Sequence, residues 1–437
     1  MLQPIVGDTR PTAINFACIE LRPIAILDKS TAIIAILTIA VCDINYENEV
    51  FAIIVEAIFN IFVAGPSSAP GAFAVTERER FVACCMGEAV DRPPYWLCWV
   101  PWRSTWKRWQ GEGMTFKTFD EVRDYFGAEK KPQVVPVNYG PCPNRGIHIL
   151  QEDDRQCLYI DSWGIKRRDF KEHESMSAFL ESPVKNREDW ESYKVAWLDP
   201  NHPDRLKGEW LPRSKMWMDK GYPIQLGNYP DVTLFGGVQW LLGAEECLMA
   251  FYDMPDLVHD IMEHLTNLYL HIFQQVVDAG VRVDVIHIWE DMSGRQGSLI
   301  SPAHFRQFMT PRYARIREFA DRHNISLMSM DTDGNPNSIV PPMMEGGVNY
   351  LWPMEVTAGA DVNIFRKKYP KLALMGGFDK RAAAQGPHAI EAEIERIRPA
   401  VENGRYIPNF DHLIPDDVSW SNFCYYAQSL KRLVGKK

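Results

Sequence analysis

The sequence predicts an α/β protein built around a barrel of parallel strands. After a polar, tryptophan-bearing stretch that ends near Gly221, short apolar runs alternate with segments of helical periodicity, which is the pattern of repeated strand and helix units. The run DTDGN (residues 331–335) directly follows one of these apolar runs. Because side chains two apart on a strand point to the same side, Asp331 and Asp333 should converge at the carboxyl end of their strand. That end of a parallel sheet is where α/β enzymes place their active sites.

Three elements are expected before the regular alternation begins. Thr76 and Glu79 have the spacing of a capping box, which predicts a helix through Met86. The apolar residues 95–100 should form the first strand. Residues 158–170 have the pattern of a β-hairpin with its turn near Trp163-Gly164, and we expect this hairpin to depart from the barrel.

The remaining elements follow one another with short connections. Strands are expected at residues 224–227, 283–289, 326–330, 350–352, 373–376 and 406–409. An amphipathic helix between the first two is predicted by the apolar series Leu257, Ile261, Leu265, Leu268, Ile272 and Val276. Later helices should begin near Ser301-Pro302 and near Pro415-Asp416, because proline is well tolerated in a first helical turn.

Residues 1–73 differ in character from the rest of the chain. They are rich in Ile and Ala, and their apolar run at residues 32–41 is too short to span a bilayer alone. We expect them to form an extension of unknown role, or to reflect a misassigned start; Lys29 before the apolar run leaves an internal signal sequence as another interpretation. A linker is predicted at residues 65–71, which contain Gly, Pro and Ser. Residues 74–437 would then be the catalytic barrel.

Composition favours a metabolic enzyme. The 437 residues are 46% hydrophobic, which allows one large core. With 47 basic against 57 acidic residues the chain has no basic footprint for nucleic acid or for an anionic membrane, so a small-molecule substrate is expected. The nine cysteines include no Cys-x-x-Cys and suggest reduced thiols, as in a cytoplasmic protein.

Four segments carry a resemblance to a known family. TERERFVACCMGEAVDRPP, LISPAHFRQFMTPRYARI, MGGFDKRAAAQGPHAIEAEIERI and GRYIPNFDHLIPDDV are similar to the uroporphyrinogen decarboxylase superfamily, which also includes corrinoid-linked methyltransferases. The resemblance begins near Thr76 and extends to the end of the chain. It implies a (β/α)8 TIM-type barrel with its site at the carboxyl face, and it suggests a homodimer.

The same resemblance suggests a metal site. Methyltransferases of this superfamily bind zinc through a His-x-Cys-Gly motif and a later cysteine, and the matching positions here are Asp331, Asp333 and His412, with Gly334 retained. Oxygen donors in place of thiolates favour zinc with oxygen ligands, Mn²⁺ or Fe²⁺. Alternatively, these residues have structural roles: Asp333 would cap the next helix, Asp331 would form a hydrogen bond with a neighbouring loop, and His412 would face solvent.

Two further acidic residues are candidates for acid or base chemistry. Glu290 ends a predicted strand in phase with Ile286 and Ile288, and we expect it to enter the mouth of the barrel as a metal ligand or general acid or base. Its alternative role is to fix the turn that follows. Asp379 is the second candidate, and it comes just after Gly376-Gly377, where missing side chains would let a ligand approach the backbone.

Substrate contacts are expected from four residues. Trp99 belongs to a group of tryptophans that would line the pocket or pack in the core, and Arg103 would anchor a carboxylate or lie on a solvated face. Arg381 would bind substrate or pair with surface acids, and Asn409 lies at a strand end beside His412.

The reaction is predicted from what the site lacks. True uroporphyrinogen decarboxylases carry an arginine-rich RQAGRY-type motif, whereas the corresponding stretch here is CWVPWRSTWKRW. An acidic mouth would also repel a substrate with eight carboxylates. We therefore expect metal-assisted, O-demethylase-like methyl transfer between a small methylated substrate and a corrinoid on a separate protein. A decarboxylase-like lyase acting on a smaller carboxylated substrate, or a non-catalytic binding barrel, are the alternatives.

Overall fold

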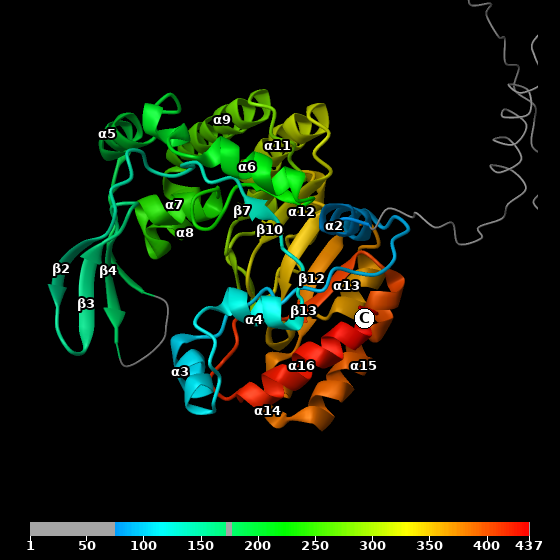
Figure 1. Ribbon diagram of the computed structural model, residues 1–437. Coiled ribbons are helices and arrows are strands. Elements are labelled where there is room, and N and C mark those ends of the chain that lie inside the picture. The colour runs from blue at the N-terminus through cyan, green and yellow to red at the C-terminus, as the bar shows by residue number, and fades with distance from the viewer. Residues whose placement is uncertain (1–74, 172–176, 437) are drawn as a thin grey trace, which may run out of the picture. The chain divides into compact units, whose positions relative to one another are not determined.

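The computed structural model describes residues 75–171 and 177–436, and it shows helices packed around a parallel sheet (Figure 1). The chain divides into two units, Met1–Ala72 and Phe73–Lys437. The predicted extension, its apolar run and the linker therefore lie outside the described residues. Among the described residues, no helix is both long enough and apolar enough to cross a membrane.

Seven parallel strands form the central sheet. Their order is β1 (Gln133–Val134), β6 (Ile224–Leu226), β7 (Val285–Trp289), β10 (Leu327–Asp331), β11 (Tyr350–Met354), β12 (Ala373–Phe378) and β13 (Tyr406–Phe410). The strands occur in the sheet in the same order as in the sequence, and every adjacent pair is parallel. The carboxyl ends of all seven strands therefore lie at one edge. The six strands predicted between residues 224 and 409 are confirmed.

The predicted first strand at residues 95–100 is wrong as a strand. Its carbonyl groups are bound by side chains: Asn409 Nδ2 donates to Trp96 O at 2.7 Å, and Arg123 Nε donates to Leu97 O at 2.8 Å. Two prolines precede the segment and one follows it, and proline lacks the N–H that a ladder needs. The described residues therefore form a seven-stranded parallel sheet without a continuous ladder that closes it into an eight-stranded barrel.

The two faces of the sheet pack against different partners. On the inner face, α2 (Glu77–Met86) closes the amino end by placing Phe81, Cys84 and Cys85 against Val285, Leu327, Tyr350, Ala373 and Ile407. The capping box predicted for this helix is confirmed, since Thr76 Oγ1 accepts from Glu79 N and Glu79 Oε2 accepts from Thr76 N. On the outer face, alternate residues such as Ile286, Ile288 and Met330 belong to the larger core shared with the helices.

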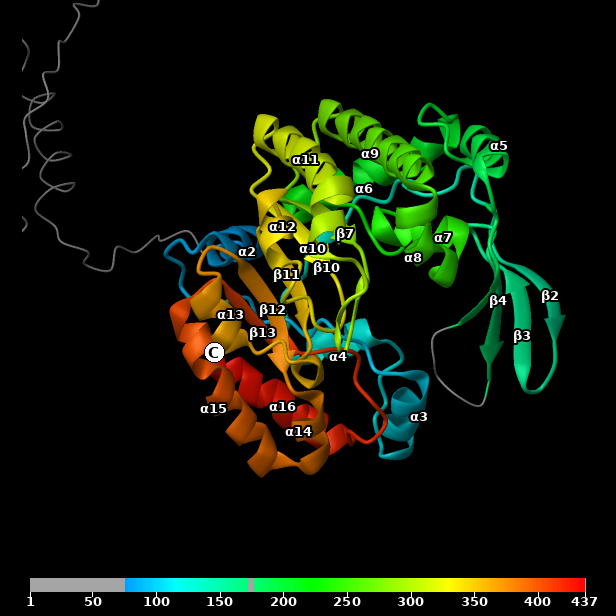
Figure 2. The ribbon, with the colours of Figure 1, turned by 180° about the vertical axis from the view of Figure 1, so that it is seen from behind.

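Helices cover the outer face (Figures 1 and 2). They include α7 (Phe235–Leu242), α8 (Ala244–Asp253), α9 (Pro255–Asp278), α11 (Thr310–Arg322), α12 (Val340–Glu345), α13 (Val362–Lys368), α14 (Lys380–Gln385), α15 (Pro387–Asn403) and α16 (Trp420–Leu433). The six apolar residues predicted to form one face of α9 are all buried. The short α10 (Pro302–His304) begins after Ser301 as expected. The last helix begins at Trp420 instead of near Pro415, because Ser419 Oγ caps it by accepting from Asn422 N at 3.2 Å.

A four-stranded antiparallel sheet projects from this body (Figures 1 and 2). We call it the arm: β2 (His148–Glu152), β3 (Gln156–Ile160), β4 (Lys166–Phe170) and β5 (Ala178–Glu181). It contains the predicted hairpin, with Trp163 and Gly164 in the turn between β3 and β4. Phe179 of β5 stacks on Trp240 of α7 with ring centroids 5.3 Å apart, which attaches the arm to the body.

Candidate active site

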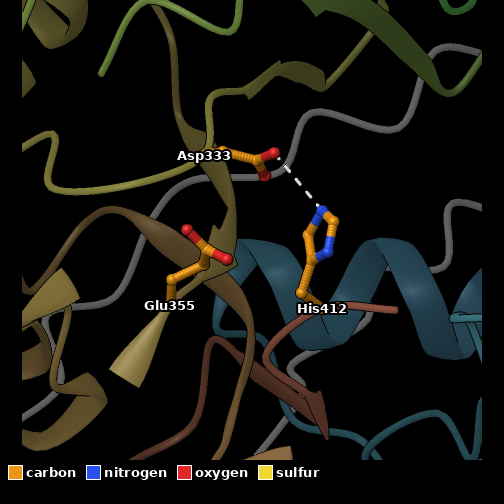
Figure 3. Close-up of side chains that lie close together, drawn as sticks. All are labelled: Asp333, Glu355 and His412. Carbon is orange, nitrogen blue, oxygen red and sulfur yellow. Dashed lines mark ion pairs between the residues drawn. The ribbon is translucent and has the colours of Figure 1, made fainter. Parts of the chain in front are cut away.

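Three potential metal ligands meet at the carboxyl edge of the sheet (Figure 3). Asp333 follows β10, Glu355 follows β11 and His412 follows β13. One ligand atom from each lies within 4.8 Å of the other two. His412 Nε2 is 3.3 Å from Asp333 Oδ2. A pair of carboxylates and an imidazole therefore face a common space.

Glu355 is held in this arrangement by its neighbours. Gly334 N donates to Glu355 Oε2 at 2.7 Å, and Lys380 Nζ lies 4.0 Å from Glu355 Oε1. Gly334 has φ +78°, and a Cβ there would lie 2.5 Å from Ser293 O. The conformation and the close approach both require glycine at this position.

Two more carboxylates surround the three ligands. Burial raises the pKa of Asp331 well above its usual value, and the charges of Asp333 and Asp291 raise it further. Burial, followed by the charge of Asp333, raises the pKa of Asp291 to about 6. Burial and neighbouring negative charge both disfavour ionisation of Asp331 and Asp291, so a cation bound among these carboxylates would be favoured.

Aromatic rings form the wall beside His412. The Trp99 ring lies 4.7 Å from the His412 ring and 5.9 Å from that of Trp352. Burial lowers the pKa of His412, but the hydrogen bond and charge of Asp333 outweigh it, and the pKa is raised overall. The imidazole is therefore held toward Asp333 between an aromatic ring and a carboxylate.

The structure brings together most of the predicted metal set. Asp333 and His412 lie side by side as expected, but Glu355 joins them within ligand distance in the place that the sequence assigned to Asp331. Asp331 remains part of the same acidic group, because burial and then the charges of Asp333, Asp291 and Glu355 raise its pKa. Glu355 was missed because the strand was expected to end at Trp352, before Pro353, whereas β11 continues to Met354.

The expectation that Glu290 enters the mouth is wrong. Its carboxylate points outward and accepts from Phe235 N at 2.7 Å and Leu234 N at 3.0 Å, at the start of α7. Thr233 Oγ1 and the Tyr313 hydroxyl donate to it as well. Glu290 points to the same side of the strand as Ile286 and Ile288, as predicted, but that side of the sheet packs against the helices.

The other predicted residues occupy varied places. Asp379 caps α14 and forms an ion pair with Arg381 at 2.6 Å, so these two residues satisfy each other. Asn409 is buried and binds the 95–100 segment. Arg103 is exposed at the start of α3 (Arg103–Gly111). The catalytic role of Asp379 and the substrate-binding roles of Trp99, Arg103, Asn409 and Arg381 stay predictions.

Asp411 connects the loops around the site. Its buried carboxylate accepts from Val356 N and from Lys380 N, each at 3.2 Å. Burial raises its pKa to about 6, although the charge of Lys380 lowers it. These bonds fix the segments that carry Glu355 and Lys380.

A family model, two curated proteins and a solved structure are similar to this chain. Residues 240–433 match the model of a family described as uroporphyrinogen decarboxylase. A uroporphyrinogen decarboxylase of Prochlorococcus marinus is 20% identical over 75% of this chain and 88% of its own length. Another, from a Sulfurovum species, is 21% identical over 44% of this chain and 53% of its own length. A solved methyltransferase from Methanosarcina mazei shares the fold, with TM-score 0.54 and 18% identity over 82% of this chain and 98% of that one.

The fold of the chain is that of α/β proteins with a parallel sheet, in which sites commonly lie at the carboxyl edge. The chain is therefore similar to the uroporphyrinogen decarboxylase family over residues 240–433 and shares the fold of the Methanosarcina mazei methyltransferase.

Proposed function

We propose that this chain is a methyltransferase with a divalent metal ion bound by Asp333, Glu355 and His412. The observation that carries the proposal is the convergence of their ligand atoms within 4.8 Å of one another. Two oxygen donors and one imidazole suit zinc, Mn²⁺ or Fe²⁺. The name of the structural neighbour from Methanosarcina mazei supports methyl transfer as the reaction.

The expected reaction is O-demethylase-like transfer from a small methylated substrate to a corrinoid on a separate protein. When bound, the metal would supply Lewis acidity to a substrate oxygen. The chain's own residues have separate tasks: Gly334 orients Glu355, and Trp99 packs against His412. Oxygen donors make an ether or hydroxyl oxygen a better partner for the metal than a thiolate.

The acidic group argues against uroporphyrinogen as substrate. Burial raises the pKa of Asp331, and the charges of Asp333, Asp291 and Glu355 raise it further. A substrate with eight carboxylates would add to this repulsion. Anaerobic incubation with uroporphyrinogen is expected to give no coproporphyrinogen. Enzyme-like turnover in that assay would contradict the proposal.

A decarboxylase-like lyase on a smaller substrate is the second candidate. It is favoured by Asp291, whose pKa of about 6 allows a carboxyl group to donate a proton near neutral pH. The names of the two curated relatives point the same way.

Metal analysis of the purified protein separates the two candidates. We expect Asp333→Asn, Glu355→Gln and His412→Ala each to weaken metal binding by about 100-fold or more. Asp219→Asn, at the exposed end of α6 (Trp210–Asp219), is the matched control and should bind normally. Methyl transfer from methoxylated aromatic compounds to cob(I)alamin should stop when a chelator removes the metal. Full metal content in all three variants, or decarboxylation that survives the chelator, would favour the lyase.

A further inference from the structure

The outer strand of the arm has an unpaired edge. In the order β2-β3-β4-β5, β2 has a neighbour on one side among the described residues. All five of its residues are exposed. In both ribbon views β2 is the strand of the arm farthest from the body (Figures 1 and 2). Its free edge therefore presents backbone groups that a further strand can bind.

Apolar side chains gather along this edge. Ile147, Ile149 and Leu150 are 68%, 60% and 50% exposed. β2 contains neither proline nor lysine, two residues with which proteins commonly protect an edge strand. The opposite edge differs, because Phe179 of β5 is stacked on Trp240 of the body.

We propose that β2 pairs antiparallel with β2 of a second copy of this chain, so that two four-stranded arms form one eight-stranded sheet. Antiparallel pairing of a strand with itself generates a two-fold axis and uses the same surface on both copies. With the axis at Leu150, His148 lies opposite Glu152 of the partner subunit. The sequence HILQE therefore places a basic residue opposite an acidic one at both ends of the pair.

The pairing of β2 with β3 leaves Leu150 free for this role. The register passes from Ile149 opposite Tyr159 to Gln151 opposite Leu158, so Leu150 has no residue opposite it on β3. In the proposed dimer, Leu150 meets the partner's Leu150 on the axis. Lys171 Nζ binds Glu152 Oε1 at 2.8 Å and fixes that carboxylate near the end of the strand.

The oligomeric state of the full chain tests whether the β2 edge is a dimer interface. Sedimentation equilibrium should give twice the 50.2 kDa chain mass for the wild type. Ile149→Asp should raise the dissociation constant by about tenfold or more, because it removes an apolar side chain and places a charge one residue from the Leu150 pair on the axis. Val195→Asp is the matched control, since Val195 is 76% exposed on α5 (Arg187–Trp197), away from β2. A wild-type monomer, or an Ile149→Asp dimer as tight as the control, would overturn the proposal.

A charge exchange and a cross-link test the register. His148→Glu should weaken the dimer by placing like charges opposite each other, and the double variant His148→Glu/Glu152→His should restore it. Leu150→Cys should form a disulfide-linked dimer under mild oxidation, whereas the wild type should not. Circular dichroism of each variant identifies any that fails to fold, and the cross-link then decides through a substitution that adds no charge. A double variant no tighter than the single one, together with no cross-link, would exclude this interface.

Discussion

At the scale of single residues, the site depends on backbone conformations that few side chains adopt. Gly334 has φ +78° and donates its N–H to Glu355. Asp291 has φ +40°, in the left-handed region that Asp and Asn tolerate better than most residues. Both residues lie in loops after parallel strands, where chemistry and backbone strain often occur together.

Gly334→Ala should destabilise the protein and weaken metal binding. The left-handed conformation alone costs about 1 kcal/mol for a residue with a Cβ, and the new Cβ would also lie within 2.5–2.6 Å of the carbonyl oxygens of Ser293 and Gly294. Gly359→Ala is the control, because Gly359 has φ +86° with no atom within 4 Å of the added Cβ. Thermal unfolding and metal titration of both variants measure the difference. Equal losses in the two variants would contradict the proposed role of the close approach.

Asp291→Asn should stabilise the metal-free protein above pH 6 and leave it unchanged below pH 4. The folded-state pKa of Asp291 is raised from 3.8 to about 6, so the folded protein keeps a proton that the unfolded chain releases. Stability from this group is present below the unfolded pKa and is lost as pH rises through the folded pKa. Asn removes that loss, which amounts to on the order of 3 kcal/mol at pH 8. Urea unfolding of both proteins with a chelator at pH 4 and pH 8 tests the pH dependence, and an equal difference at both pH values would refute it.

At the scale of elements, α7 depends on a buried carboxylate. The first backbone N–H groups of a helix lack partners within the helix. Here Glu290 accepts from Leu234 N, Phe235 N and Gly236 N, as well as from two hydroxyl groups. Glu290 also immediately precedes Asp291, so the same residue fixes a helix start and one wall of the site.

Glu290→Gln should lower the free energy of unfolding by about 2 kcal/mol, because an amide NH₂ would face buried donors. Tyr313→Phe removes one of the donors and should cost less, about 1 kcal/mol. Glu318→Gln on α11 is exposed and serves as the control. Urea denaturation of the three variants measures their free energies of unfolding and so gives the order of their stabilities. A Glu290→Gln variant as stable as the control would show that these hydrogen bonds contribute little.

At the scale of the whole molecule, the folded unit begins at residues that are fixed by contacts within that unit. Thr76 caps α2, and the Val75 carbonyl accepts from Arg80 Nη2 at 3.2 Å. Removal of the residues before Val75 should therefore leave a folded protein with a cooperative thermal transition. Calorimetry of the truncated and full chains tests this. Aggregation of the truncated form, or loss of a transition that the full chain shows, would contradict it.

The sequence by itself determined the six strands from residue 224 onward and the long helix α9, and it placed Asp333 and His412 at one edge. Local rules suffice for this, because apolar periodicity marks the elements and parallel strands share a carboxyl edge. The capping box at Thr76 likewise depends on contacts four residues or fewer apart. The resemblance to the uroporphyrinogen decarboxylase superfamily rests on motifs of the same local kind.

Only the tertiary structure decided which side of each strand faces the site. β7 is buried on both faces, so its hydrophobic pattern gives no information about which set of side chains points inward. That is why Glu290 was assigned to the mouth although it binds α7. Glu355 joined the site through a strand that continues past Pro353. Residues 95–100 contact the sheet through the side chain of Asn409, and Arg123 of the helix Phe119–Phe126 binds them as well. These outcomes depend on contacts between segments distant in sequence, which periodicity along one segment does not encode.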